Sequence, residues 1–335
     1  MRIRSAISAA NSLPEFPHLP VNNEWRANRL FELVSSWSVT KASVSNDHDV
    51  RQDDHLLAPG NDQCWSFHPH AACVRKVAVR GGVLSGTRPS AMDTFNDALM
   101  RAKCVRASLE HRGDVRCSKA TFRSELFFLQ GSWVVNFQPF VAAAIYEWFA
   151  GSAGAVVFDS SAGWGGRMLG AVLARNVCAH IACEPSTKTF LGLRQMQEML
   201  RPHSLDIQLH QAGSEDFALE PNSVDFAFTS PPYFLLELYA DEGSQAHIKY
   251  PTYPQWRQGF LKPTIRNNLR ALKPGGNLLI NIANNKMFLD IGIDLESDTC
   301  DIARELGAVQ QDTVRMLKPD GPIDRWEPIF VFRRV

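Results

Sequence analysis

The amino-acid sequence predicts an α/β fold with a mostly parallel sheet and an antiparallel edge. Short apolar runs alternate with helical patterns from about residue 136 to the end of the chain. A glycine-rich turn joins the first of these runs to a helix, and the last two apolar runs follow one another with no helix between them. Hydrophobic residues make up 45% of the chain and charged residues 21%, which is ordinary for a globular protein.

The individual elements follow from hydrophobic periodicity and from helix start and stop signals. Pro139 marks a helix start because its fixed φ suits the first helical turn, and Lys273-Pro274-Gly275-Gly276 marks a helix end. Helices are expected over 140–150, 167–175, 187–200, 253–272 and 299–306. Strands are expected over 155–159, 178–183, 206–210, 224–229, 277–281, 309–316 and 328–332.

The N-terminal region has a different character. Residues 1–62 are punctuated by prolines and polar stretches, which predicts poor order or loose packing. Residues 63–135 are basic and partly helical, with a helix expected over 92–110. Between 70 and 125, eleven Lys and Arg face five Asp and Glu, a net charge of +6. This excess favours contact with nucleic-acid phosphates, the alternative being a solvated helix face. The third region, residues 136–335, contains the regular alternation of predicted strands and helices.

The segment Ser230-Pro231-Pro232-Tyr233 directly follows the apolar strand 224–229. Two prolines fix φ and remove two backbone donors, so the strand must stop there. The result is a stiff elbow that holds a hydroxyl group and a phenol ring beside two carbonyls. Such an elbow can accept hydrogen bonds from a planar amino group while the ring stacks on its plane. This is what methylation of an exocyclic amine of a base requires.

A second motif, Asp159-Ser160-Ser161-Ala162-Gly163-Trp164-Gly165-Gly166, follows the first strand and opens a helix. Its glycines let the backbone approach a ligand, and the helix N-terminus offers free N–H groups. The spacing is not a clean G-x-G-x-x-G, and the lysine of a phosphate-binding loop is absent. A tight turn without a ligand is therefore the alternative.

Acidic residues follow the next two strands. Glu184 is placed to bind the ribose hydroxyls of a nucleoside, as a carboxylate does in dinucleotide-binding folds. Glu215 and Asp216 are candidates to accept from an adenine amino group while Phe217 packs on the ring. A helix-capping or surface role is the alternative for these two acids.

Taken in this order, the motifs resemble those of S-adenosylmethionine-dependent DNA amino-methyltransferases, which act on cytosine N4 or adenine N6. The resemblance covers about 136–335. It implies a Rossmann-like class I methyltransferase fold with a seven-stranded sheet and S-adenosyl-L-methionine as the methyl donor. The family's first motif often reads Asp-Pro-Phe-x-Gly-x-Gly, so Trp164 and the two serines give this turn a different lining.

The resemblance also implies roles for individual residues. The catalytic set is Ser230, Pro231, Pro232 and Tyr233. The residues implied to bind the donor are Phe137, Pro139, Asp159, Ser161, Gly163, Trp164, Gly165, Glu184, Pro185, Glu215, Asp216 and Phe217. Phe137 and Pro139 belong to the start of a helix that closes the donor pocket in this family.

The function expected from these motifs is methylation of a DNA base that leaves the duplex, with cytosine N4 favoured and adenine N6 next. Restriction-modification is one role for such an enzyme. RNA methylation at guanine N2 and a non-catalytic nucleic-acid-binding subunit are the alternatives. About 70 residues separate the two motifs, which leaves no room for a target-reading domain between them. Specificity is therefore expected in 60–130, in the loop 234–252, which we read as a substrate-facing flap, or in a partner.

Other signals are weaker. Cys64, His68, His70 and Cys73 have irregular spacing for a zinc site, and no metal is predicted. Seven irregularly spaced cysteines suit a reducing cytoplasm. No apolar run approaches the ~20 residues that span a bilayer, and the N-terminus does not read as a signal peptide, so no membrane partner is expected.

Overall fold

The computed structural model describes residues 50–51, 64, 74–79, 82–87, 90–111, 135–317 except 152 and 202, and 326–335. The predicted N-terminal segment 1–62 therefore lies almost wholly outside the described residues. Of the four candidate zinc ligands only Cys64 is described, and its side chain is buried. Within the described ranges, no group of three or more His, Cys, Asp and Glu side chains is arranged to hold a metal ion.

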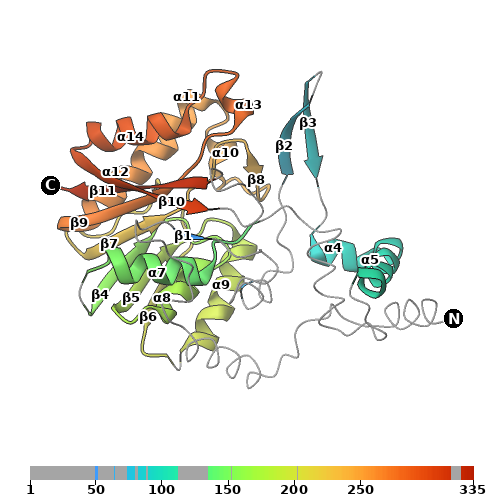
Figure 1. Ribbon diagram of the computed structural model, residues 1–335, viewed down its shortest axis with the longest axis horizontal. Helices are drawn as coiled ribbons and strands as arrows, with labels where there is room; N and C mark the ends of the chain where they lie inside the picture. Colours follow the sequence, from blue (N-terminus) through green and yellow to red (C-terminus); the bar gives the residue numbers. More distant parts are fainter. Residues whose placement is uncertain are drawn as a thin grey trace.

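The core of the protein is one mixed sheet with the strand order β1-β10-β11-β9-β7-β4-β5-β6 (Figure 1). The five strands from β6 to β9 are mutually parallel, and β11 is antiparallel to both β9 and β10. The strands are β1 (Val50–Arg51), β4 (Ala155–Asp159), β5 (Val177–Cys183), β6 (Asp206–His210), β7 (Val224–Thr229), β9 (Leu272–Asn281), β10 (Ala308–Leu317) and β11 (Trp326–Arg334). The predicted seven-stranded sheet with an antiparallel edge is confirmed, and the two-residue β1 extends it.

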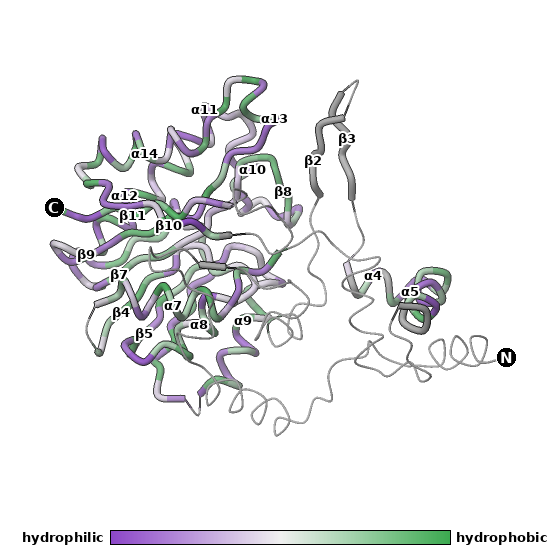
Figure 2. Tube along the Cα trace, viewed as in Figure 1, coloured by the Kyte–Doolittle hydropathy of each residue, from purple (hydrophilic) through white to green (hydrophobic). Residues whose placement is uncertain are grey.

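Helices cover both faces of this sheet. One layer consists of α7 (Pro139–Phe149), α8 (Gly166–Leu173) and α9 (Thr187–Leu200), and the other contains α12 (Lys262–Ala271) and α14 (Leu295–Glu305). Strand residues alternate between the layers: Phe226 and Phe228 pack toward α7, while Ala227 packs toward α12. Figure 2 shows the apolar stretches of α7 and of the central strands between these layers.

The long helix expected over 253–272 contains a wider turn. It runs as α11 (Tyr253–Trp256), a π-helical segment η2 (Arg257–Leu261) and α12. Pro263 in the first turn of α12 lacks an N–H group, and its ring would collide with the carbonyl group four residues earlier in a regular α-helix. A π segment directly before the proline accommodates this ring.

Two other boundaries differ from the sequence prediction. The helix ends at Ala271, directly before the lysine-proline-glycine-glycine segment, so the predicted helix stop is confirmed. β9 begins earlier than expected, at Leu272 opposite Val224, and the pairing then jumps to Asn277 opposite Phe226, so this segment forms a bulge in β9. α14 begins four residues earlier than expected because the Asp294 side chain caps it by accepting from the Ser297 N–H at 2.9 Å.

The helix expected over 92–110 is divided into α4 (Ala91–Asn96) and α5 (Ala98–His111). Asp97 separates them because its carboxylate accepts from the N–H groups of Leu99 and Met100, at 2.8 and 2.9 Å. Leu99, in the first turn of α5, is 67% exposed.

A small second sheet joins the N-terminal region to the main domain. It has the order β3-β2-β8, with β2 (Val74–Val79), β3 (Gly82–Thr87) and β8 (Glu237–Leu238). β2 and β8 are antiparallel, with Val74 opposite Leu238. In Figure 1 the β2–β3 hairpin projects beside β8 and the short helix α10 (Ala246–Lys249), away from the main sheet.

We expect Gly166→Ala to lower the free energy of unfolding by about 1–3 kcal/mol in urea denaturation. A Cβ at Gly166 would overlap the Phe137 carbonyl oxygen and lie 2.8 Å from Asn136 Oδ1, so the backbone before α7 would have to move. Gly243→Ala is the matched control because a Cβ there meets nothing within 4 Å. Equal stability of the two variants would contradict this packing.

Candidate functional site

The predicted site residues converge at one edge of the sheet. The parallel strands β4, β5, β6 and β7 end at Asp159, Cys183, His210 and Thr229, and a predicted motif follows each of them. The order of strands reverses at β4, which has β5 on one side and β7 on the other. Ligands of open α/β sheets bind at the carboxyl ends of the strands beside such a reversal.

The glycine-rich turn after β4 has the backbone that its sequence requires. Gly163 and Gly165 have φ values of 53° and 82°, the left-handed region in which side chains are strained. A Cβ at Gly163 would meet the Ser161 carbonyl oxygen at 4.0 Å, an ordinary van der Waals distance, so the positive φ and not crowding favours glycine there. Trp164 is 7% exposed and packs edge-on against Tyr239 of the loop after the elbow, with ring centroids 6.0 Å apart.

Asp159 and Ser161 stabilise this turn through hydrogen bonds with each other and with Arg167. Asp159 is fully buried, and its Oδ2 accepts from Arg167 Nε at 2.8 Å, while its Oδ1 accepts from the Ser161 N–H at 3.2 Å. The Arg167 guanidinium also donates to the Ser161 carbonyl and lies 5.4 Å from the centroid of the Phe137 ring. Asp159 therefore positions the turn through Arg167.

Arg167 was not among the predicted site residues. A cation in the first turn of a helix is electrostatically unfavourable because the helix N-terminus carries partial positive charge. The position of Arg167 in the first turn of α8 therefore indicates that its side chain pairs with an anionic group.

Glu184 links the glycine-rich turn to α9. Its Oε2 accepts from the Gly163 N–H at 3.2 Å and its Oε1 from the Ser186 N–H at 2.8 Å. Burial of the carboxylate raises the pKa of Glu184 to about 7, against the lowering effect of these two N–H groups. Each carboxylate oxygen keeps a further lone pair for a hydroxyl donor.

The acidic pair after β6 is held by Lys249, the last residue of α10. Lys249 Nζ lies 2.5 Å from Asp216 Oδ2 and also bonds Glu215, whose side chain is only 2% exposed. The Phe217 ring lies 4.4 Å from the His210 ring, centroid to centroid, and packs beside Phe158. Lys249 was predicted only as part of the flap, and its two acidic partners were not foreseen.

The elbow after β7 is fixed by one residue of β9. Ser230 Oγ donates to Asn281 Oδ1 at 3.4 Å, and the Tyr233 hydroxyl donates to the Asn281 carbonyl at 3.3 Å. Asn281 is 3% exposed and donates from its own side chain to the Pro328 carbonyl at 3.0 Å. The structure therefore brings the two predicted catalytic side chains to a common anchor, which the sequence analysis did not identify.

The backbone turns sharply after the elbow. Phe234 has φ of 50°, which is unusual for a bulky residue. This conformation places its ring among those of Tyr253, Trp256 and Phe288, with centroid separations of 5.4 to 5.9 Å. The elbow is thus held by Asn281 on one side and by an aromatic cluster on the other.

The loop 234–252 lies against the glycine-rich turn and the start of α9. The Glu242 carboxylate accepts from the Thr187 N–H at 2.9 Å and from Ser186 Oγ at 3.0 Å, and Ser244 Oγ donates to the Pro185 carbonyl at 3.2 Å. These hydrogen bonds lower the pKa of Glu242, although burial alone would raise it. The predicted flap is an ordered segment that closes on Pro185 and its neighbours.

Three buried polar atoms lie in the segments that form this edge. Thr229 Oγ1, His210 Nε2 and Gln245 Nε2 have no hydrogen-bond partner within the described part of the chain. Buried polar groups in folded proteins are nearly always paired, so such atoms indicate where a polar ligand would be bound.

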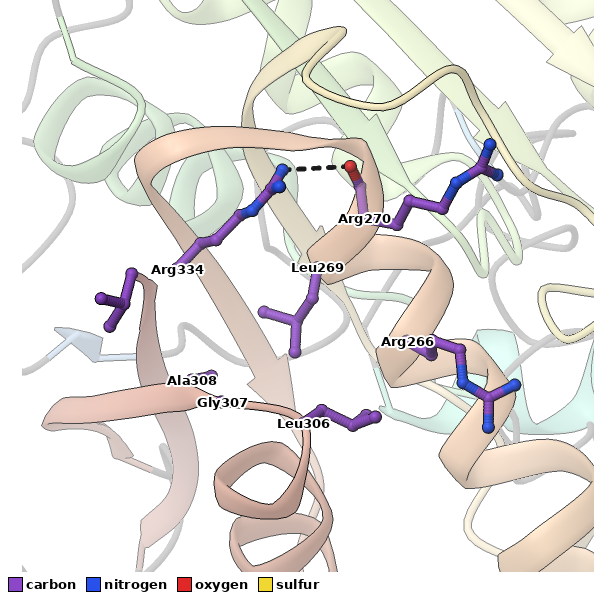
Figure 3. Close-up of a pocket in the computed structure, with 8 residues that line it drawn as sticks. Arg266, Leu269, Arg270, Leu306, Gly307, Ala308 and Arg334 are labelled. Atoms are coloured by element: carbon purple, nitrogen blue, oxygen red, sulfur yellow. Dashed lines mark hydrogen bonds between the residues drawn. The ribbon is translucent and has the colours of Figure 1, made fainter.

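A separate pocket of about 370 Å³ lies where α12 ends, β10 begins and β11 ends, away from this edge (Figure 3). Arg334 is committed there to the end of α12, because it donates to the Arg270 carbonyl at 3.1 Å and to Asn222 Oδ1 at 2.7 Å. In Figure 3 the side chains of Arg266 and Arg270 point away from Leu269 and Leu306. The polar groups of this pocket do not converge.

The sheet order decides the fold class. From β6 to β10 it places the first strand of the domain, β4, between β5 and β7, and the antiparallel strand β11 between β9 and β10. The fold is that of the Rossmann-like class I methyltransferases. No family model and no curated protein matches the chain. Among the described residues, no helix is long and apolar enough to cross a membrane.

Several solved structures are similar to this chain at low identity. A methyltransferase from Pyrococcus furiosus is 15% identical, with a TM-score of 0.39, over 59% of this chain and 83% of that one. The N-methyltransferase NodS from Bradyrhizobium japonicum, in complex with S-adenosyl-L-homocysteine, is 16% identical, with a TM-score of 0.39, over 57% and 83%. A putative methyltransferase in complex with the Haloferax volcanii Trm112 activator is 14% identical, with a TM-score of 0.41, over 58% and 86%.

Proposed function

We propose that this protein transfers a methyl group from S-adenosyl-L-methionine to an exocyclic amine of a DNA base, with cytosine N4 favoured and adenine N6 next. One observation carries the proposal: Ser230 and Tyr233 are held together on Asn281, at the same sheet edge as the glycine-rich turn and Glu184. The elbow would bind the acceptor amine, and the glycine-rich turn with Glu184 would bind the nucleoside part of the donor. Methyl transfer requires both sites side by side.

The residues of the turn side fit the donor. Glu184, bonded to the Gly163 N–H, would offer acceptors for two ribose hydroxyls. Phe217 would pack on the adenine ring, and Glu215 or Asp216 would accept from its amino group. Thr229 Oγ1 and His210 Nε2 supply further polar partners. When bound, S-adenosyl-L-methionine supplies a methyl group on a positively charged sulfur atom.

The elbow would act on the acceptor amine. Because Ser230 Oγ donates its proton to Asn281 Oδ1, both of its lone pairs remain free to accept from an amine N–H. The Pro231 carbonyl would accept the second N–H, and the Tyr233 ring would stack on the base. These contacts localise the nitrogen lone pair and aim it, so the rate gain is mainly orientation. The methylated nitrogen is acidic and releases its proton without a strong general base.

The test is incubation of the purified protein with donor labelled in the methyl group and with duplex DNA, single-stranded DNA or structured RNA. We expect label in DNA, and none with Tyr233→Ala. Label in RNA alone would favour the guanine-N2 reading and overturn the proposal, as would label in neither polymer.

A further inference from the structure

We propose that Asn281 makes the acceptor site selective for bases that carry an exocyclic amine and against bases that carry a keto group at the same position. This inference rests on the proposed function because it concerns the substrate of the same elbow. Asn281 is 3% exposed, so it acts through its neighbours as a positioning residue and does not itself bind the base.

The register of the strands brings Asn281 beside the elbow. β7 and β9 are parallel neighbours, with Thr229 opposite Ile280. The residues that follow these two, Ser230 and Asn281, therefore lie side by side. On its other edge β9 pairs with β11, and Asn281 Nδ2 donates to the Pro328 carbonyl of that strand at 3.0 Å.

Pro328 fixes the orientation of the Asn281 amide. A proline has no N–H group, so the backbone of Pro328 offers only a carbonyl oxygen, and Asn281 must turn its NH2 group toward it. The Asn281 Oδ1 atom then faces Ser230 Oγ, 3.4 Å away, and an amide oxygen can only accept a hydrogen bond. The hydroxyl proton of Ser230 is consequently directed to Asn281.

The direction of this hydrogen bond decides what the elbow can bind. With its proton on Asn281, Ser230 Oγ presents only lone pairs, and the Pro231 carbonyl is also an acceptor. The amine of cytosine or adenine offers two N–H groups to these two acceptors, whereas a keto oxygen would meet lone pairs on both sides.

Rotation of the Ser230 hydroxyl toward a keto group would be costly. It would leave the buried Asn281 Oδ1 without its donor. A site whose polar groups find no partner on the wrong substrate rejects that substrate strongly. The three groups Pro328, Asn281 and Ser230 therefore act in series to select an amine.

Asn281 also anchors Tyr233, but through its backbone. The Tyr233 hydroxyl donates to the Asn281 carbonyl at 3.3 Å, a bond in which the Asn281 side chain takes no part. Replacement of this side chain should therefore change the hydrogen bonding of Ser230 and keep the anchor of the tyrosine ring. Base selectivity and base stacking can thus be separated by mutation.

The test compares single-stranded oligonucleotides that carry an amine or a keto group at the position in question, with S-adenosyl-L-homocysteine at saturation. Fluorescence anisotropy gives the ratio of dissociation constants for oligo(dU) against oligo(dC) and for oligo(dI) against oligo(dA). We expect the wild-type protein to bind the amino member at least about tenfold more tightly in one pair or both. Asn281→Ala should reduce this ratio to about threefold or less, because the freed Ser230 proton can then be donated to a keto oxygen. Asn281→Asp keeps an acceptor beside Ser230 and should retain the ratio.

Asn277→Ala is the matched control. Asn277 also lies on β9, and its side chain also donates to a backbone carbonyl, that of Phe149 at 3.4 Å, but it is paired with Phe226 and not with the end of β7. This variant should keep the wild-type ratio. Affinity for S-adenosyl-L-homocysteine, measured for each variant, shows that the catalytic domain is folded.

Four results would overturn the inference: no preference in either pair with the wild type, an unchanged ratio in Asn281→Ala, an equal loss in Asn277→Ala, or a lost ratio in Asn281→Asp with normal donor-product affinity. If Asn281→Ala does not fold, the ratios of the wild type and Asn281→Asp decide. If the ratios are as expected but the wild type methylates no DNA, the role of Asn281 stands and the proposed reaction fails. Methylation of DNA without a preference in the ratios has the reverse meaning.

Discussion

Replacement of Tyr233 by alanine is expected to lower kcat/KM for methyl transfer by about 100-fold or more and to leave the affinity for S-adenosyl-L-homocysteine within about twofold. Loss of stacking on a base costs about 1–3 kcal/mol, and misplacement of the amine adds to this. The donor side is unaffected because Tyr233 is anchored on Asn281 of β9, whereas the donor-side contacts of Glu184 lie with Gly163 and Ser186.

Two further variants separate the roles of Tyr233 and Ser230. Tyr233→Phe keeps the ring and loses the hydrogen bond to the Asn281 carbonyl at 3.3 Å, so a loss within about tenfold is expected. Ser230→Ala should reduce kcat with little change in donor affinity. If these substitutions weaken donor binding but leave the single-turnover rate at saturating donor unchanged, the division of the edge into donor and acceptor sides is wrong.

Glu184→Gln is expected to weaken binding of S-adenosyl-L-homocysteine by about 10- to 100-fold in calorimetry. A hydrogen bond to a charged acceptor contributes about 1.5–3 kcal/mol, and the amide offers one acceptor where the carboxylate offers two. The matched control is Glu198→Gln, an exposed residue near the other end of α9 that pairs with Arg201. Equal affinity in wild type and Glu184→Gln would remove Glu184 from the donor site.

Donor affinity should also depend on pH in a defined window. The pKa of Glu184 is raised to about 7, so the carboxylate is protonated as pH falls through that value. Binding that requires the ionised form should weaken about tenfold between pH 8 and pH 6, and the Glu184→Gln profile should be flat.

The stability of the fold should depend on pH in the opposite direction to donor affinity, decreasing as pH rises. Ionisation of an enclosed group with a raised pKa destabilises the fold, so this cost appears as pH rises from the ordinary value of 4.5 to about 7. Glu184→Gln should therefore melt at a higher temperature than the wild type at pH 8. An unchanged or lower melting temperature would contradict the assignment of burial as the cause.

Much of the fold could be predicted because its signals are local. The bounds of β4, β6, β7 and α9 follow from short apolar runs and helical spacing, and the structure confirms them. The site motifs are also contiguous in sequence, and the parallel topology alone brings their strand ends to one edge.

The parts that could not be predicted depend on contacts between distant segments. Asn281 holds Tyr233 from 48 residues away, and Lys249 holds Glu215 from 34 residues away. Neither residue stands in a motif, and only the folded sheet shows what it contacts. The pairing of β2 with β8 is a similar case, since a two-residue strand has no periodicity that a sequence could show.

Mass spectrometry of nucleosides from the DNA of cells that express the wild-type protein, the Tyr233→Ala variant or neither tests the central claim most directly, since it reports both the base and the methylated atom. We expect N4-methylcytosine, or else N6-methyladenine, with the wild-type protein alone. Absence of either nucleoside from the DNA, or their presence at equal levels with Tyr233→Ala, would contradict it.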